Sequence, residues 1–149
     1  MSERQATLLV ADELLVSVTG KFIVQSVFTS DIVLATDPML VAQLIFFFLI
    51  ECDIQNPFQT LAVQVTLPGE SPVTSAVPIV RPAPDSIPPG RTRWINRWPI
   101  VYSLPTLRPG RIEAKVIHES GEIAVTAPWI VMVGAGSNLP GTGAAMSSA

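Results

Sequence analysis

The chain has 149 residues and a formal net charge of −3, with one cysteine and one histidine. One cysteine excludes an internal disulfide, and one histidine with one cysteine disfavours a zinc site. The polar start shows no secretory signal, and the longest apolar run, 44–50, is far shorter than the roughly 20 residues that span a bilayer. We therefore expect a cytoplasmic domain, or one incorporated in a particle assembled in the cytoplasm.

Strand signals dominate the first half of the chain. Segments 7–18 and 22–35 are rich in Val, Leu, Ile, Phe and Thr and flank the turn Thr19-Gly20-Lys21, which predicts a hairpin. Segment 41–52 is apolar on both faces, as in a central strand or a buried helix, and its three consecutive phenylalanines favour the strand. Segment 59–67 alternates apolar and polar residues, the period of a half-buried strand.

The second half begins with a weaker strand signal at 73–80, where Pro78 suits an edge strand better than a central one. Segment 81–90 holds four prolines and is expected to be a loop. Segments 111–118 and 122–133 flank the turn Glu119-Ser120-Gly121 and predict a second hairpin.

A strand is also predicted at 92–104, between the proline-rich loop and the second hairpin. Alternation gives it one face with Trp94, Trp98, Ile100, Tyr102 and Leu104. The opposite face then carries Arg93, Ile95, Arg97 and Val101.

Short strands broken by Pro and Gly turns are typical of a sandwich or barrel. We predict an all-β, antiparallel, immunoglobulin-like β-sandwich of about eight strands over residues 1–133. Residues 134–149 are rich in Gly, Ala and Ser and carry no charge. This composition predicts a flexible C-terminal tail.

Three turn-based motifs carry a resemblance to a known family. They are Ala11-Asp12 followed by Gly20-Lys21, Phe28 in a strand ending in Asp31-Ile32-Val33, and Pro109-Gly110-Arg111 leading into Lys115-Val116. The chain resembles an uncharacterised bacterial family of small immunoglobulin-like β-sandwich proteins of unknown function. The resemblance implies the fold and no site residues. Val27 stands where the family pattern expects glycine, and the C-terminal tail is not part of that pattern.

The residues of enzyme and cofactor sites are sparse. The glycines after residue 133 do not form a phosphate-binding loop. Asp37 and Asp53 flank one predicted strand and should lie at its opposite ends, which disfavours a calcium site. Cys52 is expected to be a buried apolar residue and His118 a hairpin residue. We therefore expect no catalytic residues, no metal and no cofactor, and interpret the chain as a non-enzymatic module.

The segment 91–98 combines arginine with tryptophan. Its candidate interaction residues are Arg91, Arg93, Arg97, Trp94 and Trp98. Three interpretations stay open: tryptophans in the core with solvated arginines, a protein interface, or a polyanion or nucleic-acid site in which bases stack on the aromatic rings. The negative net charge weighs against a general nucleic-acid binder.

Charge is both scarce and unevenly distributed. Charged residues make up 14% of the chain, against roughly 25% in ordinary globular domains. Residues 81–111 carry a net charge of +5 and the remainder carries −8. A surface short of charge is expected to be covered by other subunits, and the opposite charges suit head-to-tail association. We predict a subunit of an assembly, a homo-oligomer or a packed array such as a phage particle component, and no membrane partner. The competing explanation is a monomer with a surface rich in serine and threonine.

Overall fold

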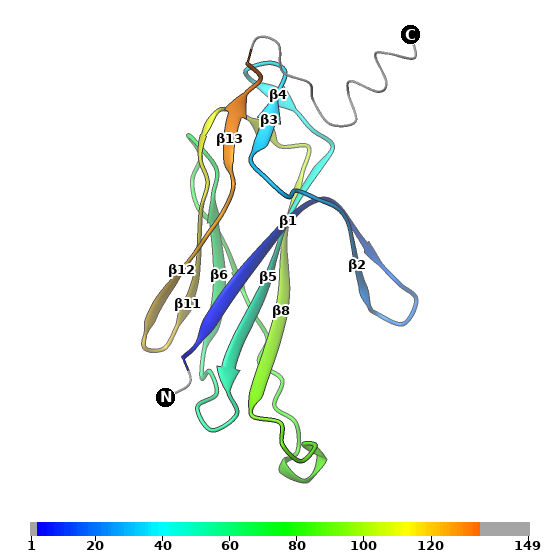
Figure 1. Ribbon diagram of the computed structural model, residues 1–149, viewed down its shortest axis with the longest axis vertical. Coiled ribbons are helices and arrows are strands. Elements are labelled where there is room, and N and C mark those ends of the chain that lie inside the picture. Colours follow the sequence, from blue (N-terminus) through cyan, green and yellow to red (C-terminus); the bar gives the residue numbers. More distant parts are fainter. Residues whose placement is uncertain (1–2, 135–149) are drawn as a thin grey trace.

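Two four-stranded antiparallel sheets pack face to face in the computed structural model, which describes residues 3–134 (Figure 1). The first sheet has the order β2-β1-β5-β8, with β1 (Gln5–Val16), β2 (Phe22–Val27), β5 (Gln43–Asp53) and β8 (Arg93–Ser103). The second has the order β12-β11-β6-β7, with β6 (Leu61–Thr66), β7 (Val73–Ala76), β11 (Glu113–His118) and β12 (Gly121–Val125). The predicted all-β sandwich is confirmed, and these two sheets hold eight strands.

Two smaller sheets close one end of the sandwich, at the top of Figure 1. They consist of β3 (Ile32–Leu34), β10 (Gly110–Arg111) and β13 (Trp129–Met132), and of the pair β4 (Met39–Leu40) and β9 (Thr106–Leu107). β3 and β13 pair in parallel, in a small sheet outside the two antiparallel sheets of the predicted sandwich. The proline-rich loop at the opposite end contains one short 3-10 turn, η1 (Pro84–Ser86).

Two segments that the sequence predicts as single strands are broken in the structure. Segment 22–35 divides into β2 and β3, and segment 122–133 divides into β12 and β13. The first break, at 28–31, follows the last two residues of β2, where Ser26 has a φ of 58° that is unfavourable for a regular strand. The second break, at 126–128, contains Pro128, which has no N–H for a sheet ladder. Each break transfers the chain from a main sheet to the small sheet in which β3 and β13 are neighbours.

β5 is an interior strand of the first sheet. Segment 41–52, for which the sequence allowed a strand or a buried helix, therefore forms a strand. It pairs with β1 on one side and along its full length with β8 on the other. Phe46 and Phe48 are fully buried in the main core. Phe47 lies on the other face and is still only 6% exposed, and the Phe22 ring packs edge-on against it at 5.9 Å. Both faces of β5 are therefore covered, as its apolar sequence requires.

β6 confirms the predicted alternation of the second sheet. Leu61, Val63 and Val65 are buried, whereas Gln64 and Thr66 are only partly covered. Burying one such aliphatic side chain contributes roughly 1.5–3 kcal/mol. The short strand β7 lies at the edge of this sheet, as Pro78 predicted. The two faces of the sandwich thus meet in a continuous apolar core.

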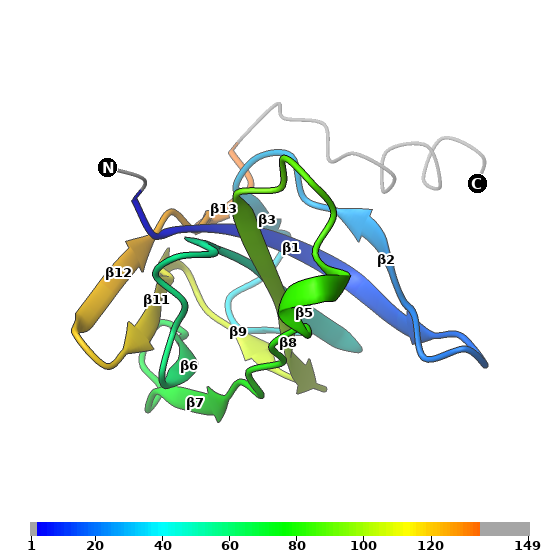
Figure 2. The ribbon, with the colours of Figure 1, turned by 90° about the horizontal axis from the view of Figure 1, so that it is seen from below.

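The first predicted hairpin is confirmed, and it extends beyond the sandwich. β1 pairs with β5 as far as Ala11, and from Glu13 onward its partner is β2. We call residues 12–27 the arm. In Figures 1 and 2 the arm projects from the side of the molecule, away from the second sheet.

Candidate functional site

The structure separates the five predicted interaction residues. Trp98 Nε1 donates a hydrogen bond to Ser75 Oγ at 2.9 Å, which joins β8 to β7 at the open side of the sandwich. Trp94 and Trp98 both pack partly buried against the core, as the first interpretation of this segment expects. Arg97 is exposed to solvent. Leu104, predicted on the tryptophan face, is instead 66% exposed because its φ of 52° turns the chain out of the strand.

Arg93 is held by two contacts at the start of β8. Its Nη2 lies 3.6 Å from Glu51 Oε2 and donates to the Glu3 carbonyl at 2.8 Å. The guanidinium of Arg91 lies over the Trp94 ring, 5.2 Å from its centroid. Only Arg91 and Trp94 of the five line a common pocket.

This pocket, which we call the Arg91 pocket, lies between the loop after β5 and the proline-rich loop before β8. Its volume is about 510 Å³. Its apolar walls include Pro57, Phe58, Ile79, Pro82 and Ile87. Ligand pockets of small molecules are typically of this size and similarly apolar.

Two buried donors without a partner lie in the walls of the Arg91 pocket. Asn96 is 9% exposed, and its Nδ2 has no hydrogen-bond partner among the described residues. The same is true of Trp94 Nε1. Leaving such a group unsatisfied costs roughly 1–3 kcal/mol. Both atoms are shielded from solvent by neighbouring side chains.

Positive charge faces the same pocket. Arg81 lines it and donates from Nη2 to the Phe58 carbonyl at 3.1 Å and to Gln59 Oε1 at 3.1 Å. Among the described residues that line the pocket, Arg81 and Arg91 are charged and none is acidic. An acceptor that enters the pocket therefore meets two guanidinium groups.

A cluster around Arg4 fixes one wall of the pocket. The Arg4 guanidinium lies 4.4 Å from the centroid of the Phe58 ring, and its Nη2 donates to Glu119 Oε1 at 2.7 Å and to the Pro57 carbonyl at 2.9 Å. Burial alone would raise the pKa of Glu119, but hydrogen bonds from its own amide, Arg4 and the amides of residues 59 and 60 lower it to about 2. The Phe58 wall is thereby held by charged hydrogen bonds.

His118 and Cys52 make no catalytic pair within the described residues. His118 Nδ1 accepts hydrogen bonds from Arg4 at 3.1 Å and from the Ser120 amide at 3.2 Å. Cys52 is buried, and burial raises the pKa of its thiol. In residues 3–134, no group of three or more His, Cys, Asp or Glu side chains is placed to hold a metal ion. The same part of the chain has no helix that is long and apolar enough to cross a membrane.

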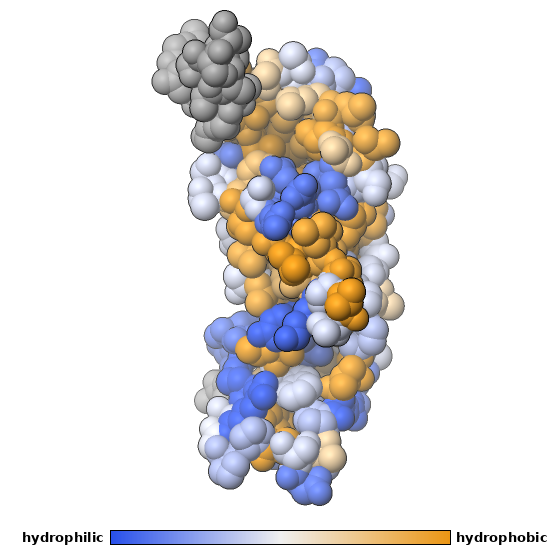
Figure 3. All heavy atoms as spheres, turned by 90° about the vertical axis from the view of Figure 1, so that its right-hand side faces the viewer, coloured by the Kyte–Doolittle hydropathy of each residue, from blue (hydrophilic) through white to orange (hydrophobic). Residues whose placement is uncertain are grey.

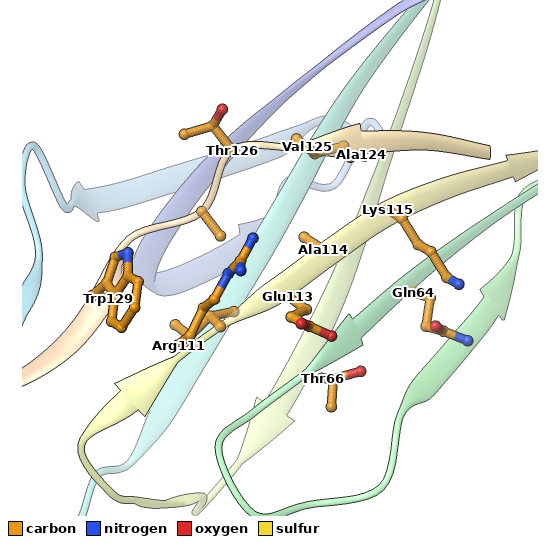
Figure 4. Close-up of a pocket in the computed structure, with 12 residues that line it drawn as sticks. Gln64, Thr66, Arg111, Glu113, Ala114, Lys115, Ala124, Val125, Thr126 and Trp129 are labelled. Atoms are coloured by element: carbon orange, nitrogen blue, oxygen red, sulfur yellow. The ribbon is translucent and has the colours of Figure 1, made fainter.

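A second hollow, of about 530 Å³, lies on the outer side of the second sheet (Figure 4). Figure 4 shows Trp129 and Arg111 on one side of it and Gln64 and Lys115 on the other. Glu113 also lines it, so the hollow carries charges of both signs. None of the buried polar atoms without a partner belongs to its lining residues. We therefore assign it no ligand.

The arm forms a different kind of surface. Its exposed apolar side chains, each at least 39% accessible, are Leu15, Val16, Val18, Phe22, Ile23 and Val27. Figure 3 views the molecule from the side on which the arm projects, and shows apolar side chains gathered over the middle and upper part of that face. Large exposed apolar patches on soluble domains are typically interaction sites.

β2 is also an edge strand without the usual protection. Edge strands normally avoid pairing with other chains by means of charges, prolines or short length. β8 carries Arg97 and Pro99, β12 carries Glu122, and β7 has four residues with Pro72 before it and Pro78 after it. β2 has the sequence FIVQSV, with neither charge nor proline. Of the four edge strands of the main sheets, β2 is the longest that carries neither charge nor proline.

Part of the signal for both surfaces is visible in the sequence. Alternation along 92–104 places Asn96 on the same face as Trp94, which puts a polar residue at a core-facing position. The absence of charge from 22–27 is equally visible in the sequence. Arg81 and Phe58 line the Arg91 pocket only because two loops meet in the fold. No local sequence pattern predicts that contact.

Comparisons with family models, with curated proteins and with solved structures each matched nothing to this chain.

Proposed function

We propose that the chain is a non-enzymatic structural subunit that associates with copies of itself through the edge strand β2. The observation that carries this proposal is the unprotected, uncharged edge of an arm whose apolar side chains are exposed. Strand addition at such an edge supplies backbone hydrogen bonds and covers apolar surface at the same time. A particle built of many copies, such as that of a phage, is an assembly that this mode of association suits.

Antiparallel pairing of two β2 strands is the arrangement that we favour. It joins two four-stranded sheets into one continuous sheet around a twofold axis, so each copy uses the same surface. The tip of one arm, which carries Lys21, then lies beside the base of the other arm, which carries Asp12 and Glu13. Opposite charges are therefore brought together at both ends of the pairing.

The charge distribution supports this arrangement over a contact made by the basic segment 81–111. Arg93 begins β8 at one end of the sandwich, whereas Arg111 lies in β10, which pairs with β13 at the other end (Figure 1). The arginines of that segment do not form one patch that could meet an acidic surface. The polyanion alternative requires Trp98 and Arg93 to be available for a ligand. Trp98 instead donates a hydrogen bond to Ser75, and Arg93 lies against Glu51.

Light scattering coupled to size exclusion tests the proposal. The wild-type chain is expected to elute with a mass of two or more copies. Two lysines in place of exposed residues of β2, Ile23→Lys with Gln25→Lys, should give the mass of one chain, because lysine on an edge opposes strand addition.

The matched control is Val73→Lys, which places lysine on the edge strand of the other sheet at a residue that is 40% exposed. This variant should retain the wild-type mass. A wild-type chain that is monomeric over a wide range of concentration would contradict the proposal, and so would a β2 variant that assembles like the wild type.

A further inference from the structure

We propose that the Arg91 pocket is a binding site for a carboxylate carried on an apolar body. This site is independent of the association surface, because β2 and the pocket lie in different parts of the fold. The pocket is built from the loop after β5, the proline-rich loop and the start of β8. The arm contributes no residue to its lining.

The first step of the inference concerns the buried donors. Asn96 is in the interior of β8, where its register partner is Ile50, and it is the one polar residue among the buried side chains of residues 3–134. A polar side chain at a core-facing position normally has a partner. Asn96 Nδ2 and Trp94 Nε1 have none, and both residues line the pocket. Both atoms are shielded from solvent in the chain without a ligand, so an acceptor from outside satisfies them once a side chain of the pocket wall moves aside.

The second step concerns charge. Arg81 and Arg91 line the pocket, and neither has an acidic partner within the described part of the chain. Arg91 Nε donates to the Arg93 carbonyl at 3.2 Å while its guanidinium lies over Trp94, so the side chain is held in place. Guanidinium groups match carboxylates in shape and charge. An anionic acceptor thus fits the site better than a neutral one.

The third step concerns the body of the ligand. The walls are formed by proline, isoleucine and phenylalanine side chains, and Phe58 is fixed by the Arg4 guanidinium on its other side. A fully hydrated polyanion gains nothing from such walls, whereas an aromatic or branched aliphatic group does. The ligand is either a free small carboxylate or an acidic residue next to an apolar one in a peptide segment. Both present the same chemistry.

Nuclear magnetic resonance provides a direct test. The ¹⁵N-labelled full chain is titrated at pH 7 with 3-phenylpropanoate, with its neutral amide, and with the blocked dipeptide acetyl-Asp-Phe-amide. The indole resonance of Trp94 and the side-chain amide of Asn96 should shift with the carboxylate probes and at least tenfold more weakly with the neutral amide. The tighter of the two carboxylates identifies the source of the ligand.

The other two tryptophans are internal controls. Trp98 Nε1 is already bonded to Ser75, and Trp129 lies in the other hollow, so their indole resonances should stay in place. Arg91→Met should weaken binding at least tenfold while it keeps the apolar stem over Trp94. Arg97→Met removes the same charge from the exposed face of β8 and should bind as the wild type does.

Asn96→Leu removes the buried donor while it nearly preserves volume, and it should also weaken binding at least tenfold. If this variant fails to fold, the Arg91→Met comparison still decides. The proposal is overturned if neither carboxylate shifts Trp94 at 10 mM, if the neutral amide binds equally well, or if Arg97→Met loses as much as Arg91→Met. The first of these results would mean that Asn96 Nδ2 stays unpaired in the fold.

Discussion

Glu119 joins three segments of the chain through one carboxylate. It pairs with Arg4 near the N-terminal end of the described chain, accepts from the Thr60 amide at 3.4 Å, and belongs to the turn between β11 and β12. Its side chain is 24% exposed, so solvent screens part of the interaction. We expect Glu119→Gln to reduce the free energy of unfolding by about 1 kcal/mol at pH 7.

The lowered pKa of Glu119 gives this prediction a pH dependence. The folded pKa of about 2 lies below the ordinary value of 4.5, so the stabilisation is complete above pH 4.5 and is lost as the pH falls through 2. Urea unfolding between pH 7 and pH 2 should show a steeper loss of stability for the wild type than for Glu119→Gln. Glu122→Gln is the control, because Glu122 is 54% exposed in its pair with Lys115. Equal pH profiles of all three proteins would contradict this role of Glu119.

At the scale of single residues, the sequence predicts burial better than it predicts partners. Alternation correctly put Trp94 and Trp98 toward the core and Arg97 toward solvent. It did not predict that Arg93 pairs with Glu51, since that contact depends on the register of β8 against β5. It also missed Asn96, whose lack of a partner is a property of the folded chain.

β5 is the element on which the core depends, and its two faces should respond differently to truncation. Phe46 is fully buried between the sheets, whereas Leu49 is only partly buried on the outer face of the strand. We expect Phe46→Ala to cost about 3–5 kcal/mol in the free energy of unfolding, because it leaves a cavity that the sheets cannot close. Leu49→Ala should cost less than half as much. Urea unfolding checks both, and similar losses would contradict the assignment of the two faces.

Elements with a strong period were predicted correctly, and their ends were not. The long apolar strand β5, the alternating strand β6 and both hairpin turns agree with the sequence. The breaks at 28–31 and 126–128 were missed because β3 and β13 are parallel neighbours that are almost 100 residues apart in sequence. No local pattern indicates that such segments will leave one sheet and form another.

At the scale of the whole molecule, the tertiary arrangement changes the meaning of the charge distribution. The sequence suggested a basic segment and an acidic remainder that could attract each other between copies. In the fold the arginines of 81–111 are divided between the two ends of the sandwich, and one of them is neutralised by Glu51. The scarcity of charge over the whole chain remains, and in the arm the edge strand β2 has no charged side chain while several apolar ones are exposed. The predicted tail, 134–149, lies outside the described residues apart from Gly134.

Amide hydrogen exchange as a function of protein concentration tests the central proposal most directly. If copies pair through β2, the backbone amides of 22–27 should exchange more slowly as concentration rises, because those that point away from β1 become hydrogen-bonded. The amides of β7, the edge of the other sheet, should exchange at the same rate throughout. Exchange in β2 that does not depend on concentration over the range in which light scattering detects association would contradict pairing at this edge.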